Sequence, residues 1–301
     1  MENLLVNKVA AVKEVRQAAE YQKKKQACIL TGLAGSSKPV FFAAADKLLG
    51  GKGSMAFITA SREEIRTYRR ELNYLYPDLP MQELYPVSLP RVQADTQSLE
   101  LQAGRAAALR FLSGEERGIV FITAEALQQK QLRPSGMSGK ALQLAVGEEH
   151  EQRNIAAALL DLGYERTEQV DALGQFCLRG DILDVYPINS SAAVRIEWFD
   201  NELDAMRSFD VDTQRSLQTL TSIKIAPLKV DESFSYDADI FEYCAADTMV
   251  VVDEPVHVFS MLEKLDKENK EHASELFNKQ ELIEQLAANG AVLVSALGHS
   301  Y

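Results

Sequence analysis

A stretch of about forty residues, from Phe176 to Leu217, constrains the fold of this chain more than any other part of the sequence. Side chains along residues 193–199 alternate between two faces, with Val194, Ile196 and Trp198 on one and Arg195, Glu197 and Phe199 on the other. This period of two is typical of a strand with one buried face. Asp200-Asn201 fits a tight turn, and the chain then returns as a second strand. The stretch therefore predicts antiparallel β-structure.

Two further apolar runs precede this strand pair and meet at Arg179-Gly180-Asp181. Tyr186-Pro187 closes the second run, and we expect the strand to end there because proline has no N–H to give to a ladder. The order of these residues resembles a domain shared by the UvrB component of the UvrABC excinuclease and the transcription-repair coupling factor. The matching positions are Phe176, Arg179-Gly180-Asp181, Asp184, Tyr186-Pro187, Arg195 to Asp200, Glu202, Ser208 to Asp210 and Thr213-Gln214.

Near the N-terminus, an apolar strand leads into a Gly-rich turn, a lysine and a helix, which is the layout of a phosphate-binding P-loop. Gly32, Gly35 and Lys38 fit this layout, but Ser37 stands where the pattern has its second glycine, and Pro39 where it has Ser or Thr. Serine adds a Cβ where phosphates need close backbone approach. Proline has no hydroxyl for magnesium and no N–H for phosphate. We therefore expect a degenerate remnant of the loop that has lost nucleotide binding.

A second remnant follows an apolar strand at residues 248–252, whose three consecutive valines indicate a buried parallel strand. Asp253-Glu254 comes next, in the layout of a Walker B motif, where Asp supports magnesium and Glu polarises water. Because the P-loop has lost its key residues, we interpret Asp253 and Glu254 as a Walker B remnant without catalysis.

Apolar strands and amphipathic helices alternate outside the central stretch, which favours a parallel sheet with helices on its faces. We expect strands at 27–30, 54–59, 118–123 and 292–294, helices at 5–26, 61–75 and 96–112, and two helices within 256–288. The fold class is thus α/β: a degenerate RecA-like, P-loop NTPase-type sheet with helices on both faces, interrupted by an inserted α+β domain with a mainly antiparallel sheet. The predicted domains are 1–140 and 229–301, the two parts of the RecA-like domain, and 141–228, the inserted UvrA-binding domain.

The charge balance disfavours nucleic acid as a partner of this chain. The sequence has 32 Lys and Arg residues and 44 Asp and Glu residues, which gives a net charge of −12. Residues 141–228 contain 7 Lys and Arg residues and 15 Asp and Glu residues. Such a surface lacks the basic footprint of a DNA-binding module. The loop from Tyr85 to Val92 also lacks the aromatic-rich hairpin with which UvrB probes DNA. We expect little direct DNA binding and favour a protein partner.

Other functional classes find no support in the sequence. The three cysteines and four histidines show no metal-ligand spacing, and no nucleophile arrangement is present, so we expect no metal, no cofactor and no active site. The chain has no 18-residue apolar run and no signal-peptide layout, which predicts a cytoplasmic protein without a membrane segment.

Arginines of the central stretch are the candidate partner-binding residues. A guanidinium forms bidentate contacts with carboxylates, and arginine is over-represented at binding hot spots. The resemblance implies docking on UvrA, another component of the excinuclease, through Arg179 of the Arg-Gly motif and through Arg166. The alternative for Arg179 is a local salt bridge to Asp181 or Asp184.

Three other positions qualify this comparison. Tyr186 and Phe176 are weaker partner-binding candidates, for which packing in the core is the favoured interpretation. Cys177 stands where UvrB has a further arginine, in agreement with the coupling-factor version of the domain.

The resemblance covers the whole chain and implies a UvrB-like interaction module of a transcription-repair coupling factor. Such a module recruits UvrA, and with it nucleotide excision repair, to stalled RNA polymerase, while other domains of the full-length family bind polymerase and DNA. The module itself is not expected to be an enzyme. The alternatives are a helicase-like ATPase or DNA-damage-binding subunit of the excinuclease, and a structural spacer without a partner. The last predicted strand lies close to Tyr301, which suggests a fragment of a longer protein.

Overall fold

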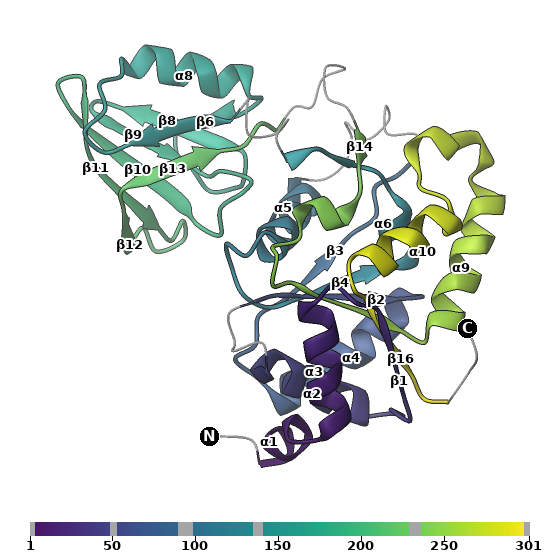
Figure 1. The fold of residues 1–301 in the computed structure, drawn as a ribbon. Coiled ribbons are helices and arrows are strands. Elements are labelled where there is room, and N and C mark those ends of the chain that lie inside the picture. Colours follow the sequence, from purple (N-terminus) through teal and green to yellow (C-terminus); the bar gives the residue numbers. More distant parts are fainter. Residues whose placement is uncertain (1–3, 49–52, 90–98, 135–140, 229–235, 298–301) are drawn as a thin grey trace. The chain divides into compact units, whose positions relative to one another are not determined.

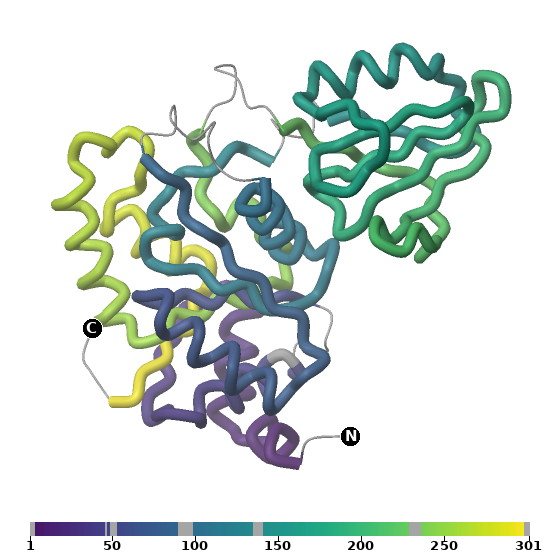
Figure 2. The backbone as a smooth tube through the Cα atoms, turned by 180° about the vertical axis from the view of Figure 1, so that it is seen from behind, coloured from purple at the N-terminus to yellow at the C-terminus, as the bar shows by residue number. Residues whose placement is uncertain are grey.

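The computed structural model describes residues 4–48, 53–89, 99–134, 141–228 and 236–297. They form two compact units (Figures 1 and 2). Unit 1 takes the chain up to residue 94, residues 108–131 and the chain from residue 237, and unit 2 takes residues 95–107 and 132–236. The domain boundaries predicted after residues 140 and 228 lie beside segments outside the described residues, and they stay a prediction.

Unit 1 is built on a sheet of six parallel strands in the order β1-β16-β15-β2-β4-β3. The strands are β1 (Cys28–Thr31), β2 (Met55–Thr59), β3 (Met81–Leu84), β4 (Ile119–Thr123), β15 (Met249–Asp253) and β16 (Val292–Ser295). Every residue of β2, β4 and β15 is buried. Continuous apolar runs form these strands because helices cover both faces of a parallel sheet.

Helices cover each face of this sheet, as Figure 1 shows. On one face lie α1 (Leu4–Ala10), α2 (Lys13–Lys23), α3 (Ser37–Leu48) and α4 (Arg62–Leu75). On the other lie the second half of α5 (Leu99–Leu112), then α6 (Ala124–Gln128), α9 (Pro255–Glu268) and α10 (Lys279–Ala288). The single helix predicted at 5–26 is wrong, because residues 11 and 12 separate α1 from α2.

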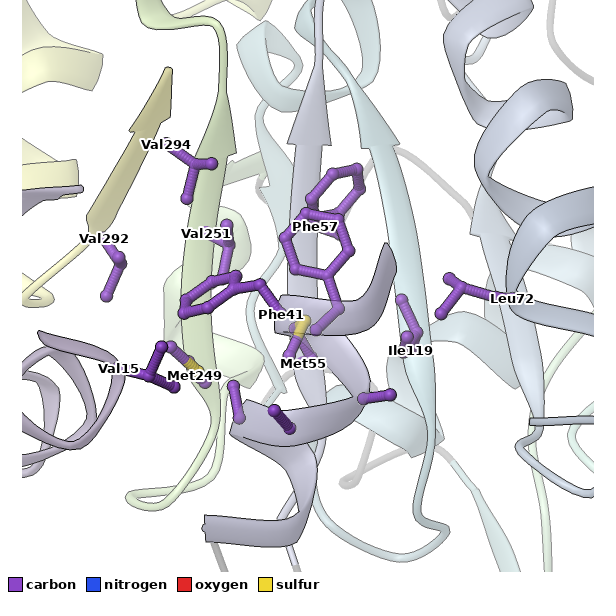
Figure 3. Close-up of a cluster of buried hydrophobic side chains, with 14 of the residues drawn as sticks. Val15, Phe41, Met55, Phe57, Leu72, Ile119, Met249, Val251, Val292 and Val294 are labelled. Carbon is purple, nitrogen blue, oxygen red and sulfur yellow. The ribbon is translucent and has the colours of Figure 1, made fainter. Parts of the chain in front are cut away.

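Alternate residues of the central strands fill two separate cores. Met55 and Phe57 of β2 enter the first core (Figure 3). The ring of Phe57 lies edge-on to that of Phe42, with 4.3 Å between the ring centres. Ala56 and Ile58 enter the second core on the opposite face. Full burial of one such phenylalanine contributes about 1.5–3 kcal/mol, so these layers account for much of the stability of unit 1.

Unit 2 contains a second, mainly antiparallel sheet in the order β12-β11-β10-β9-β8-β7. Its strands are β7 (Glu165–Arg166), β8 (Gln175–Arg179), β9 (Ile182–Val185), β10 (Ala193–Phe199), β11 (Glu202–Phe209) and β12 (Ser216–Leu220). Only the pairing of β7 with β8 is parallel in this sheet. Helix α8 (Gln152–Asp161) packs on one face, and β6 (Leu142–Ala145) pairs with β13 (Ser222–Ile225) beside it. The predicted fold class is confirmed.

The alternation in the central stretch gives the two faces expected from the sequence. Val194, Ile196 and Trp198 of β10 are buried in the core under α8. Two tight turns connect its hairpins. Gly180, with φ +55°, begins the turn between β8 and β9, and Asp200, with φ +57°, begins the turn between β10 and β11. Primed hairpin turns need such positive φ values, which explains glycine after Arg179.

The sequence did not predict the remaining short elements. Two short strands pair with each other, β5 (Gln131–Leu132) and β14 (Tyr236–Ala238). Single turns of 3₁₀-helix occur at η2 (Ile240–Tyr243) and η3 (Lys270–Glu275). Within the described ranges, no helix has the length and apolar character needed to cross a membrane.

Candidate protein-interaction site and nucleotide-site remnant

The loop between β1 and α3 contains the glycines of the predicted P-loop remnant, and two of its N–H groups are bonded within the loop. Gly32 (φ +87°) and Gly35 (φ +52°) provide the left-handed conformations of the loop. The N–H of Ser37 donates to the carbonyl of Ala34, and the N–H of Lys38 to that of Gly35, both at 3.2 Å. The N–H groups of Ser37 and Lys38, which the P-loop layout would direct at a phosphate, are thus bonded to carbonyls of the loop itself.

The side chain of Lys38 contacts Asp253 and Glu254, the two residues predicted to be a Walker B remnant. It comes from the first turn of α3, is 6% exposed, and places Nζ 2.6 Å from Asp253 Oδ1 and 2.6 Å from Glu254 Oε1. Asp253 ends β15, and Glu254 takes a left-handed backbone with φ +42° before α9 begins. The parallel sheet brings these residues together because the carboxyl ends of its strands share one edge.

Two further residues complete the network, and the sequence did not reveal either as part of it. The hydroxyl of Tyr68 in α4 donates to Asp253 Oδ2 at 2.6 Å. The hydroxyl of Ser295, at the end of β16, donates to Glu254 Oε2 at 3.1 Å. Tyr68 was predicted only as part of the apolar face of its helix, and its carboxylate partner lies 185 positions away.

The electrostatics keep this network charged around its lysine. Burial lowers the pKa of Lys38, but the hydrogen bonds to Asp253 and Glu254 outweigh burial, so the pKa is raised above its ordinary value. Burial raises the pKa of Glu254, while Lys38 and the N–H of Ala296 lower it, and the net change is downward. Burial, followed by the charge of Asp253, raises the pKa of Tyr68, which therefore remains a neutral donor.

The two arginines predicted from the central stretch come together at one edge of the sheet of unit 2. Arg166 lies on the edge strand β7, opposite Phe176 of β8, and Arg179 ends β8. Both side chains are exposed. They line the same open depression of about 580 Å³, together with Thr167, Glu168, Gln169, Cys177 and Leu178.

A hydrogen bond to a thiol holds Arg179 in place. Arg179 Nε donates to Cys177 Sγ at 3.1 Å, and the thiol donates in turn to the carbonyl of Glu168 at 3.0 Å. The contact with Cys177 is the main reason that the pKa of Arg179 is raised. Within the described residues, neither Arg179 nor Arg166 has a salt bridge. Their terminal nitrogens are therefore available to a partner's carboxylates.

The alternative for Arg179, a local salt bridge, is not the arrangement found. Asp184 accepts from Arg195 Nε and Nη2 at 2.6 and 2.7 Å, in a bidentate pair across β9 and β10. The guanidinium of Arg195 also stacks 4.7 Å from the centre of the Phe209 ring. Asp181 lies in the turn, where it accepts from Gln152 at 3.2 Å.

The two weaker candidates differ in their exposure. Phe176 is 0% exposed and packs in the core under α8, as the favoured interpretation of this residue states. Tyr186 is half-buried and packs with Val170 and Val211 on the opposite face of the sheet. No group of His, Cys, Asp and Glu side chains suited to a metal ion occurs in the part of the chain that the structure describes.

Comparison with known families defines the class of the second unit. Residues 142–230 match the family model of the UvrB interaction domain, and this range contains the paired sheet, α8 and both candidate arginines. The chain therefore carries a UvrB-like interaction module, as the order of residues around Arg179-Gly180 predicted.

Similar proteins place this module in one kind of repair protein. The transcription-repair-coupling factor of Bacillus subtilis (strain 168) is 36% identical over 203 residues, 67% of this chain and 17% of that protein. The same factor of Escherichia coli (strain K12) is 28% identical over 165 residues, 55% of this chain and 14% of that protein. The chain thus spans about a sixth of the length of these relatives, and its similarity to them includes the region that matches the UvrB interaction domain.

Proposed function

We propose that this chain recruits UvrA through the exposed edge formed by β7 and β8. In this proposal, Arg179 and Arg166 are the binding residues, residues 141–228 are the UvrA-binding domain, and residues 1–140 and 229–301 are the two parts of a RecA-like support. RNA polymerase and DNA are bound by other regions of the longer protein. The module would thereby bring nucleotide excision repair to a stalled polymerase.

The observation that carries this proposal is the pair of exposed arginines in one depression of a UvrB-type domain. Each guanidinium offers terminal N–H groups that have no acidic partner among the described residues. The thiol of Cys177 reduces the freedom of Arg179 by fixing its Nε. Because a fixed guanidinium loses less entropy on binding, this arrangement favours recognition of a carboxylate on a protein partner.

The proposal includes the loss of nucleotide hydrolysis. Support comes from Pro39, which provides neither a hydroxyl nor an N–H, and from Lys38, whose charge is balanced by Asp253 and Glu254 at 2.6 Å. A nucleotide phosphate would have to displace the carboxylates of Asp253 and Glu254 from Lys38. It would then lie close to both negative charges, and the loop would provide no ligand for a magnesium ion between them. The chain would therefore act by binding and not by catalysis.

Affinity for purified UvrA tests this function directly. We expect the immobilised wild-type chain to bind UvrA. Arg179→Ala and Arg166→Ala should each weaken the binding free energy by about 2 kcal/mol, which raises Kd roughly thirtyfold. Arg153→Ala is the matched control, because the side chain of Arg153 is 90% exposed on α8 and does not line the depression that contains Arg166 and Arg179. Its Kd should stay within about twofold of the wild type.

Two outcomes would contradict the proposal in different ways. If the folded wild-type chain does not capture UvrA, the function itself is wrong. If UvrA binds Arg179→Ala and Arg166→Ala as tightly as it binds Arg153→Ala, the site is wrong although the function stands.

A further inference from the structure

The outer face of α4 in unit 1 carries charged and aromatic side chains that the proposed function does not use. Arg66, Arg70 and Tyr74 follow one another at intervals of four residues, so they lie on successive turns of one helix face. Both arginines are exposed, and Tyr74 is 88% exposed. On the opposite side of the helix, Ile65 and Leu72 are 0% exposed and pack in the first core. The helix thus presents a stripe of three side chains to solvent, called the exposed stripe below.

The other two arginines of α4 are bonded within unit 1. Arg62 Nε donates to Glu83 Oε1 at 2.5 Å. Arg69 Nη2 donates to the carbonyl of Met81 at 3.4 Å. Among the residues that the structure describes, neither guanidinium of the exposed stripe has a hydrogen bond, an ion pair or a ring contact. These two guanidinium groups are therefore available to an anionic partner.

The nucleotide-site remnant anchors this helix. In the middle of α4, the hydroxyl of Tyr68 donates to Asp253, which is paired with Lys38. At the start of α4, the N–H of Ser61 donates to Glu64 at 2.9 Å as part of a capping box. A binding surface on an element fixed in this way loses little conformational entropy when a partner binds. The remnant thus provides rigidity to a helix whose outer face is free.

The charge pattern of α4 distinguishes between two kinds of anionic partner. The helix has four arginines and three glutamates, and the exposed Glu63 is a helical neighbour of Arg66. A nucleic-acid strand carries a phosphate at every nucleotide, so it would continue past the two free guanidinium groups and meet this carboxylate. A protein helix with two carboxylates one turn apart can pair with the two guanidinium groups alone. The exposed stripe therefore fits an acidic protein segment better than nucleic acid.

We propose that the exposed stripe of α4 docks an acidic helical segment of a protein partner. Two carboxylates one turn apart on that segment pair with Arg66 and Arg70, and an apolar side chain of the segment packs on the ring of Tyr74. Arginine and tyrosine are the residue types enriched at binding hot spots, in agreement with these roles. This docking surface belongs to unit 1 and does not depend on the arginines proposed to bind UvrA.

Binding of two labelled peptides to the whole chain tests this inference. One is a synthetic helical peptide of leucine, alanine and glutamate, with glutamates one helical turn apart, and the other has glutamine in place of each glutamate. In fluorescence anisotropy at low salt, the chain should bind the glutamate peptide about tenfold more tightly than the glutamine peptide. Since the chain has a net charge of −12, it repels an acidic peptide in general, and this preference requires a local basic site.

Substitutions locate the binding site of the glutamate peptide. Arg66→Ala and Arg70→Ala should each weaken binding about two- to fivefold at low salt, and these losses should shrink at about 0.5 M salt, where exposed charges are screened. Tyr74→Ala should weaken binding about threefold at both salt concentrations. Arg153→Ala, which removes a 90% exposed arginine side chain from α8, is the matched control and should bind like the wild type. All four variants should keep the wild-type melting temperature within about 2 °C, since they remove exposed atoms.

Two results would overturn the inference. If the chain binds both peptides equally, or if Arg66→Ala and Arg70→Ala bind the glutamate peptide like Arg153→Ala, no acidic segment docks on α4. If a labelled single-stranded DNA oligonucleotide binds the chain and the same two substitutions weaken its binding, the occupant is nucleic acid. UvrA binding should be unchanged in Arg66→Ala and Arg70→Ala, so a failure of this inference is distinguishable from a failure of the proposed function.

Discussion

Replacement of Lys38 by methionine tests the interpretation of the nucleotide-site remnant as a structural ion pair. Methionine keeps the apolar stem and removes the charge. The side chains of Lys38 and Asp253 are 6% and 3% exposed, and that of Glu254 is 21% exposed, so the substitution leaves two carboxylates largely out of water without their cation. Breaking a buried pair from one side costs about 3–5 kcal/mol. We expect a loss near 3 kcal/mol, because Tyr68 and Ser295 still donate to the carboxylates.

The pH dependence of this loss follows from the pKa shifts. The pKa of Glu254 is lowered in the folded protein, so its stabilising contribution is present above the unfolded value and is lost as the pH falls through the lowered one. The pKa of Lys38 is raised in the folded protein. The stabilising contribution of Lys38 is therefore complete when the pH is below the ordinary pKa of lysine, and it is lost only as the pH rises through the raised pKa at alkaline pH. The wild type should therefore exceed Lys38→Met most at neutral pH, and the difference should shrink as the pH is lowered below about 4.5.

Urea unfolding followed by two signals measures this effect. Far-UV circular dichroism reports on both units, whereas fluorescence reports on unit 2, since Trp198 is the only tryptophan of the chain. The control is the neutral site made by Lys38→Met, Asp253→Asn and Glu254→Gln together, which should regain most of the lost stability. A free energy of unfolding of Lys38→Met within about 1 kcal/mol of the wild type at pH 7 would refute the reasoning.

Three further outcomes are expected. Mg-ATP at about 1 mM should leave the melting temperature of the wild type unchanged, and a saturable rise would contradict the loss of nucleotide binding. Arg195→Ala should lower the free energy of unfolding of unit 2 by about 3 kcal/mol, because Asp184, which is 9% exposed, loses a bidentate partner. Replacement of both Arg195 and Asp184 by apolar residues should lower it less, and an equal loss would count against the ion pair. Gly180→Ala should cost about 1–2 kcal/mol because φ is +55° there, and an unshifted Trp198 unfolding curve would show that the turn tolerates a side chain.

The sequence predicted those features that depend on local pattern. The alternation along residues 193–199 identified the buried face of β10, and the capping box at Ser61 marked the start of α4, where the Ser61 N–H donates to Glu64 at 2.9 Å. The break between α1 and α2 was missed, because buried apolar residues occur on both sides of it, at Val6 and Ala10 in α1 and at Val15 in α2. Strand β12 was also missed, since four of its five residues are exposed and give no apolar period.

Contacts between distant residues could not be predicted in the same way. The motifs at Lys38 and Asp253 could be recognised separately, but their contact spans 215 positions and depends on the strand order of the sheet. Sequence proximity suggested Asp184 as a salt-bridge partner of Arg179. In the structure, the register of β9 with β10 places Asp184 opposite Arg195, and these two residues form the ion pair.

The strand order of unit 1 sets the sequence of events during synthesis. β1 lies at the edge of the sheet and pairs with β16, more than 250 residues later in the chain. At translation rates of about 5–20 residues per second, β16 is synthesised roughly 15–50 s after β1, so β1 remains unpaired with β16 for that time. The antiparallel sheet of unit 2, in contrast, is contained in residues 165–220, so it can close while the ribosome is still producing the strands that complete unit 1. The sheet of unit 2 can therefore form before that of unit 1 is complete, and we expect nascent chains to show the proposed UvrA binding before β15 and β16 have emerged.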